Sequence, residues 1–172
     1  MITFDTTALP NATSASKLPD SLLDELRTGT SFGLLFAGQG GQWLAPLAQL
    51  TRDFALEADL ADLVHRAERL LSPVAGDLSR TGTSFDPLGW LDLLAAGESA
   101  EDEDAVTAPT AAELLAPAVS VPGILLAQLG AMAALERQGL DLAVYRPAAV
   151  AGHSQGILAA EVPAGISKVE GP

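Results

Sequence analysis

A serine flanked by small residues follows a short apolar run near the C-terminal end of the sequence. The run spans residues 148–150, and the motif around the serine reads Ala-Gly-His-Ser-Gln-Gly, with the serine at position 154. This pattern is typical of a sharp turn from a buried strand into a helix, which exposes the serine oxygen beside a backbone N–H. It predicts a nucleophilic Ser154 for acyl transfer, with Gly152, His153 and Gly156 supporting the turn. The alternative is a glycine-rich turn that contains a serine without catalytic use.

A second glycine-rich turn follows another apolar run, at residues 32–37, which predicts a further buried strand. Its sequence is Gly-Gln-Gly-Gly-Gln-Trp, and Gly38 and Gly40 allow a tight turn with outward N–H groups. Acyl transfer needs two N–H donors for the tetrahedral oxyanion, one beside the nucleophile and one from a different loop. We expect Gln155 to supply the first donor and Gln39 the second. Taken alone, the turn is also compatible with Gln39 as a solvated loop residue.

Together the two motifs resemble the malonyl/acetyl-CoA:acyl-carrier-protein transacylase family. The closer likeness is to the N-terminal acetyltransferase region of bacterial, actinobacterial-like type I fatty acid synthases. The stretches that support it are residues 37–44, 85–90, 119–126, 137–142 and 151–158. The likeness spans roughly residues 20–161, and residues 162–172 lie outside it.

The order of the elements, a strand, then helices, then a strand that ends in the serine turn, describes part of a parallel α/β sheet. The resemblance implies more: a partial α/β-hydrolase-like core of an acyltransferase domain, a parallel sheet with flanking helices. It implies that Ser154 takes an acetyl starter group from coenzyme A and passes it, through an acyl-serine, to the phosphopantetheine thiol of an acyl carrier domain. The closer likeness favours acetyl over malonyl.

The resemblance also implies the substrates, the partners and the cellular setting of the chain. Acyl-CoA and the phosphopantetheine-linked carrier are substrates, and this segment binds no cofactor of its own. The implied partners are the remaining acyltransferase polypeptide, the other domains of the synthase and further copies in a homo-oligomeric complex. The implied setting is fatty acid biosynthesis in the cytoplasm.

The chain departs from the family in lacking the histidine that acts as general base, well downstream of the serine. It holds two histidines, and the side chain of His153 is expected to point away from that of Ser154. His65 falls off the apolar stripe of residues 53–71, which predicts a solvated helical histidine. The family's downstream arginine for a malonyl carboxylate is absent as well. Because a serine without a base is a poor nucleophile, we expect the isolated chain to be inactive.

These departures suggest how the chain is organised. We expect a flexible lead-in over residues 1–19, which are rich in Thr, Ser, Ala and Pro. Residues 20–172 are then the N-terminal portion of an acyltransferase domain, truncated after the serine turn. Pro163 and Gly165 disfavour continuation of the helix that begins after the serine.

The composition narrows the class of protein. Of 172 residues, 48% are apolar, enough for one core, and none is cysteine, which excludes disulfides and thiolate metal sites. No clustered carboxylate pattern at ligand spacing suggests a metal. The net charge of −13 argues against nucleic acid and anionic membrane surfaces as partners.

Apolar spacing predicts several helices that support the two turns. The shorter ones are residues 20–27, 42–50, 53–71 and 87–96, the last with Trp90, Leu91 and Leu94 inward. Residues 114–135 carry no charge and are long enough for a membrane span. Their prolines and the lack of flanking basic clusters instead favour a core helix from near Ser120, with Pro122 in its first turn, to Gly139. Its broad packed face comprises Ile124, Leu125, Gln128, Leu129, Met132 and Leu135.

Two other functions remain open at this point. A serine hydrolase or thioesterase of α/β-hydrolase type shares the serine turn, although such enzymes usually carry a His-Gly-rich oxyanion loop rather than G-Q-G-G-Q. The chain is alternatively a non-catalytic piece that must assemble with further polypeptide.

Overall fold

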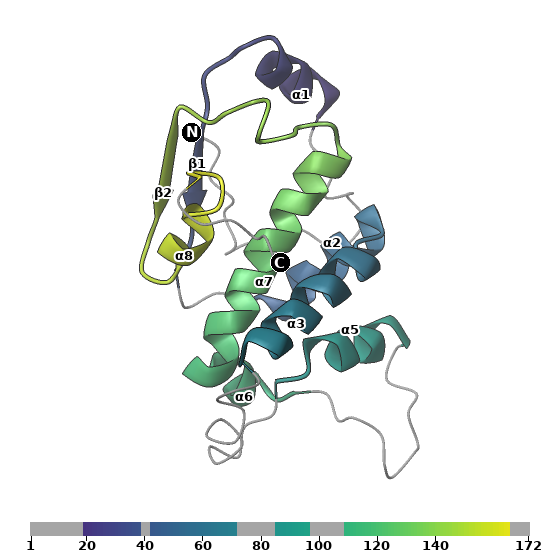
Figure 1. The fold of residues 1–172 in the computed structure, drawn as a ribbon. Helices are drawn as coiled ribbons and strands as arrows, with labels where there is room; N and C mark the ends of the chain where they lie inside the picture. The colour runs from purple at the N-terminus through teal and green to yellow at the C-terminus, as the bar shows by residue number, and fades with distance from the viewer. Residues whose placement is uncertain (1–18, 39–41, 72–84, 97–108, 166–172) are drawn as a thin grey trace.

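The computed structural model describes residues 19–38, 42–71, 85–96 and 109–165. The elements are α1 (Asp20–Arg27), β1 (Gly33–Phe36), α2 (Leu44–Phe54), α3 (Glu57–Leu71), α5 (Pro87–Ala96), α6 (Ala111–Leu115), α7 (Pro117–Arg137), β2 (Ala149–Gly152) and α8 (Gly156–Ala160). Figure 1 shows α7 in the middle, with the two strands and α8 on one side and α2, α3 and α5 on the other. The expected lead-in before Pro19 and the end of the chain after Gly165 lie outside the described residues.

The two strands form a parallel sheet, in a fold that is mixed α/β and mostly helical. Phe36 of β1 is in register with Gly152 of β2, so both strands end at the same edge. Hydrogen bonds continue the pairing at both ends, from the Ala148 N–H to the Phe32 carbonyl (2.8 Å) and from the His153 N–H to the Phe36 carbonyl (3.0 Å). The predicted strand order is therefore confirmed at the coarse level of a small parallel α/β core.

The prediction that both strands are buried is wrong. Within β1 only Phe36 is buried, and Leu35 is 48% exposed. Its register partner Ala151 is exposed as well. Parallel sheets bury both faces when helices cover both. Here α7 and α8 pack on the face that carries Phe36, Leu34 and Val150, and the described residues leave the opposite face uncovered.

Helix α7 separates two apolar clusters. The first cluster joins α7 to α2, α3 and α5 around Trp43, Leu47 and Leu60. The second joins α7 to α1, the sheet and α8, and includes Met132 and Ala159. By length and composition α7 could cross a membrane, with a mean hydropathy of 1.8 over its most apolar stretch, but 44% of that stretch is buried within the molecule.

The ends of α7 differ partly from the prediction. The helix begins at Pro117 rather than near Ser120, so Pro122 lies inside it. Pro122 removes one N–H, which in a regular helix would bond the carbonyl of Ala118, and Ala118 is exposed to water. The C-terminal end agrees with the prediction, because Gly139 follows with a positive φ of 85°.

The other helices agree only in part with the predictions made from apolar spacing. Helix α5 has the predicted bounds, with Trp90 and Leu91 buried, but Leu94 is 44% exposed rather than inward. Helix α1 ends at Arg27 as predicted, but its start differs: the sequence favours Asp20 or Ser21 as the N-cap, whereas the helix already includes Asp20 and Pro19 is its N-cap. The predicted break between helices 42–50 and 53–71 lies later in the chain, because α2 continues to Phe54 and Ala55 then takes a left-handed conformation (φ 50°) before α3 begins.

Candidate functional site

The candidate site lies where β2 turns into α8. Gly152 ends the strand, Gly156 begins the helix, and Ser154 lies between them with an exposed side chain. Ser154 has a φ of 54°, in the left-handed region. Apart from Ser154, Ala55 is the only non-glycine residue in the described ranges with a positive φ, and it closes a helix. A left-handed serine between a parallel strand and a helix is the backbone geometry of a nucleophile turn.

Three of the predicted glycines are required by close backbone packing around this turn. A Cβ at Gly152 would lie 2.4 Å from the Gly156 carbonyl carbon, and one at Gly156 would lie 2.4 Å from the Phe36 carbonyl oxygen. A Cβ at Gly38 would lie 2.6 Å from the His153 carbonyl oxygen and 2.9 Å from the Ser154 Cβ. Contacts this short leave no room for a side chain, so α8 lies directly against both strands.

The turn after β1 thus meets the serine turn at Gly38, as the two-motif prediction requires. Only its first residue, Gly38, lies in the described part of the chain. The predicted second oxyanion donor, Gln39, and its neighbour Gly40 lie outside the described residues.

His153 connects the serine turn to β1. Its N–H donates to the Phe36 carbonyl at 3.0 Å, and its Nδ1 lies 2.9 Å from the position of a Cβ on Gly38. The ring therefore lies beside Gly38, in a position to support the turn.

Gln155 occupies the N-cap position of α8. The next two N–H groups are used inside the turn: that of Gly156 donates to the His153 carbonyl (2.9 Å) and that of Ile157 to the Ser154 carbonyl (3.2 Å). In the described part of the chain the Gln155 N–H has no such backbone partner, which leaves it available to an oxygen held beside Ser154. The Nε2 of Gln155 is buried and has no hydrogen-bond partner among the described residues.

His65 lies in an exposed position on α3, as predicted. Helix α3 is on the opposite side of α7 from the sheet (Figure 1), so His65 is not placed to act on Ser154. Among the described residues no group of three His, Cys, Asp or Glu side chains is arranged to hold a metal ion.

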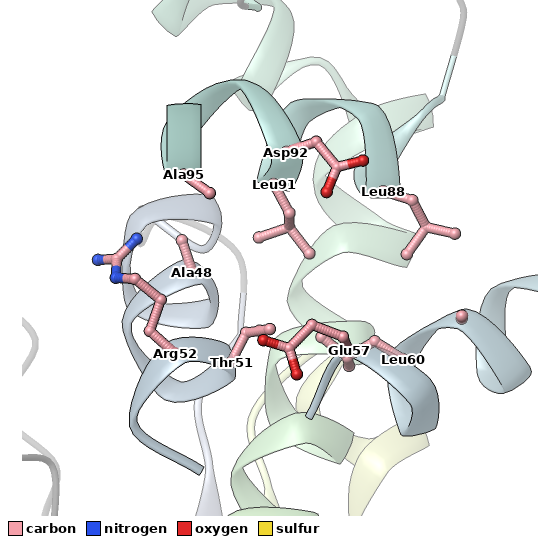
Figure 2. A pocket seen from close by; sticks show the side chains of 10 residues that line it. Ala48, Thr51, Arg52, Glu57, Leu60, Leu88, Leu91, Asp92 and Ala95 are labelled. Atoms are coloured by element: carbon pink, nitrogen blue, oxygen red, sulfur yellow. The ribbon is translucent and has the colours of Figure 1, made fainter. Parts of the chain in front are cut away.

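A cavity of about 260 Å³ lies between α2, α3 and α5, away from the serine turn. Figure 2 shows Leu88 and Leu91 from α5 facing Leu60 across it, with the charged groups of Arg52 and Asp92 at its rim. None of the predicted site residues lines this cavity.

One contact of the site was not predicted. Gln128 was assigned to the packed face of its helix, and the structure shows its Nε2 donating to the Ala37 carbonyl at 2.7 Å, at the end of β1. The sequence feature that could have indicated this contact is an amide side chain in the middle of an otherwise apolar helix face.

In comparisons with known proteins, no family model matches the chain and no curated protein matches it.

Proposed function

We propose that this chain is the nucleophile-bearing part of an acyltransferase with an α/β-hydrolase-like core. It would transfer an acetyl group from coenzyme A to the phosphopantetheine thiol of an acyl carrier domain in a type I fatty acid synthase. The observation that carries the proposal is the left-handed, exposed Ser154 between β2 and α8, in contact with the glycine-rich turn after β1. The resemblance of the two motifs supplies the substrates.

In the first half-reaction the Ser154 Oγ attacks the thioester carbonyl carbon, and its proton passes to a general base. The carbonyl oxygen becomes an oxyanion, which the N–H groups of Gln155 and Gln39 stabilise. When the C–S bond breaks, coenzyme A leaves as a thiol after taking up a proton. In the second half-reaction the carrier thiol attacks the acyl-serine, gives up its proton, and Ser154 Oγ recovers one.

The proposal requires a base from outside these residues. His153 supports the turn and His65 lies on the far side of α7, so neither is placed to take the proton. The base would come from further acyltransferase polypeptide, and the uncovered face of the sheet is consistent with such an assembly.

Hydrolysis is the second candidate, and the exposure of Ser154 favours it, because water can reach an acyl-serine as readily as a thiol. A hydrolase releases free acid from the acyl-enzyme, whereas a transferase retains the acyl group until a thiol arrives. The two functions therefore differ in the fate of the same intermediate.

The test follows that intermediate. The chain is acetylated from acetyl-CoA with imidazole added as an external base, freed of coenzyme A and acetyl-CoA, and then incubated in the same imidazole buffer with or without pantetheine. Transfer predicts a stable acetyl-enzyme in buffer and rapid formation of acetyl-pantetheine on addition of the thiol. Release of acetate at the same rate with and without pantetheine would contradict transfer and favour the hydrolase.

A further inference from the structure

Gln128, a partly buried residue of α7, places its amide group next to the second apolar cluster and the end of β1. Its neighbours one turn away on α7, Leu125 and Met132, pack into that cluster. Its Nε2 donates to the Ala37 carbonyl (2.7 Å), and its Oε1 is buried without a hydrogen-bond partner among the described residues. A buried amide with one unsatisfied oxygen is unfavourable compared with an apolar side chain of similar size. The hydrogen bond to Ala37 therefore calls for a reason other than stability.

The geometry of the peptide bond supplies a reason for this hydrogen bond. The carbonyl of Ala37 and the N–H of Gly38 belong to one planar trans peptide and point in opposite directions. By holding the Ala37 oxygen, Gln128 fixes the direction of the Gly38 N–H. The same oxygen lies only 2.6 Å from the position of a Cβ on Gly156, so this peptide is enclosed between α7 and the start of α8.

The Gly38 end of this peptide also lies beside Ser154. A Cβ on Gly38 would lie 2.9 Å from the Ser154 Cβ, so rotation of the Ala37–Gly38 peptide would move Gly38 relative to the serine. An oxyanion donor acts only if it is held in place before the charge develops.

We propose that Gln128 is a positioning residue, which fixes the Ala37–Gly38 peptide relative to Ser154. The inference rests on the proposed acyl transfer and deepens it. Gln128 touches neither substrate nor the reacting atoms in this account, and it acts through the peptide that it holds.

Three variants separate this role from a structural one. Gln128→Met keeps the length of the side chain but removes the donor. Gln128→Glu provides a donor only when its carboxyl group is protonated, because a carboxylate is an acceptor alone. Gln138→Met is the matched control, since the Gln138 Nε2 also donates to a backbone carbonyl, that of Ala134 (3.2 Å), at the far end of α7.

The first readout needs no activity. In NMR spectra, the carbonyl ¹³C of Ala37 and the amide ¹⁵N of Gly38 should shift in Gln128→Met and stay in place in Gln138→Met. Unchanged resonances in Gln128→Met would overturn the inference, whether or not the chain transfers acyl groups.

The second readout is acetylation of Ser154 from acetyl-CoA with imidazole. We expect Gln128→Met to lower the maximal acylation rate by about 10- to 100-fold, with little change in the half-saturating concentration. Gln128→Glu should approach the wild-type rate as the pH falls and its carboxyl group becomes protonated. Wild-type rates in Gln128→Met, or a Gln128→Glu deficit that does not depend on pH, would overturn the positioning role. A wild-type chain that is never acetylated would instead contradict the proposed function, and the resonances would still decide whether Gln128 holds the peptide.

Discussion

Ser154 occupies a backbone conformation that is unfavourable for any residue with a Cβ. At a φ of 54° the expected cost relative to glycine is about 1–2 kcal/mol. Strain of this kind persists where the surrounding structure enforces it, and here three close glycine contacts do so. At the scale of residues, the site is thus a serine held in an unfavourable conformation by its neighbours.

Replacing the serine by glycine should therefore stabilise the protein while removing the hydroxyl group that we propose as the nucleophile. We expect Ser154→Gly to raise the free energy of unfolding by about 1 kcal/mol, which corresponds to an increase of about 2–4 °C in Tm for a chain of this size. Ser154→Ala retains a Cβ and is the matched control, with little change expected. Thermal unfolding followed by circular dichroism would decide, and equal Tm values for the two variants would argue against strain at this position.

The glycine contacts can be tested by adding a single methyl group. Gly156→Ala places a Cβ 2.4 Å from the Phe36 carbonyl oxygen, a backbone atom that cannot move aside, so we expect a loss of about 1–3 kcal/mol. Gly33→Ala is the control in the same region, since its nearest contact is 3.4 Å away. Denaturant unfolding of the two variants should differ clearly, and a Gly156→Ala chain as stable as Gly33→Ala would refute the packing described.

Helices α2 and α7 form the main contact at the scale of elements, and two glycines of α7 lie in it. A Cβ on Gly123 would enter the indole of Trp43, 2.2 Å from its nearest carbon. A Cβ on Gly130 would approach the Leu47 Cδ1 at 2.9 Å and the Leu60 Cδ2 at 3.5 Å, which are both far ends of flexible side chains. The same substitution should therefore act differently at the two positions.

Alanine favours a helix interior over glycine by about 0.8–1 kcal/mol. We expect Gly130→Ala to retain part of this gain, and Gly123→Ala to lose about 1–3 kcal/mol because the rigid indole must shift. The measurement is the free energy of unfolding in urea for both variants. A less stable Gly130→Ala than Gly123→Ala would show that α2 does not pack on α7 in this way.

Two carboxyl groups at helix ends should affect stability with opposite dependence on pH. Partial burial, followed by the charges of Asp141 and Asp59, raises the pKa of Glu136, which lies in the last turn of α7. The folded state then holds this proton more tightly than the unfolded chain, so stability falls as the pH rises from the ordinary carboxyl pKa to the raised one. Above that range Glu136→Gln should be more stable than wild type, and the difference should vanish on acidification.

Glu113 is expected to give the opposite dependence of stability on pH. Hydrogen bonds from the Thr110 backbone N–H and hydroxyl lower the pKa of Glu113 in a capping box at the start of α6. Its contribution is therefore present above the unfolded pKa and is lost as the pH falls through the folded pKa. Glu113→Gln should lose stability near neutral pH and match wild type in acid. Thermal unfolding between pH 3 and pH 8 tests both, and differences of the same sign would contradict these assignments.

At the scale of the molecule, α7 carries both apolar clusters and also holds the end of β1 through Gln128. Arg27 fixes the other end of α7 by donating from Nη2 to the Gln138 carbonyl (2.6 Å). The serine turn is therefore supported by α7, the longest helix described. The sheet that carries the turn has two strands among the described residues.

Much of this arrangement could be predicted from the sequence, and the failures have physical causes. Glycine and serine spacing located the turn at Ser154, because close packing of a strand, a turn and a helix requires those residue types. The division between α2 and α3 was predicted a few residues too early, because Ala55 adopts a left-handed conformation that sequence normally signals with glycine. The burial of β1 was overestimated because an apolar run does not reveal whether both faces of its sheet are covered. The contact of Gln128 depends on which face of α7 meets β1, and that is set by tertiary packing.

The most direct test of the central claim is intact-protein mass spectrometry after incubation with acetyl-CoA, with and without imidazole, on wild type and Ser154→Ala. The account predicts a single acetyl adduct on wild type that increases with imidazole, because imidazole acts as the general base that the described residues do not place beside Ser154, and none on Ser154→Ala. An adduct of equal extent on both proteins, or no adduct on wild type at any imidazole concentration, would contradict the assignment of Ser154 as an acyl-accepting nucleophile.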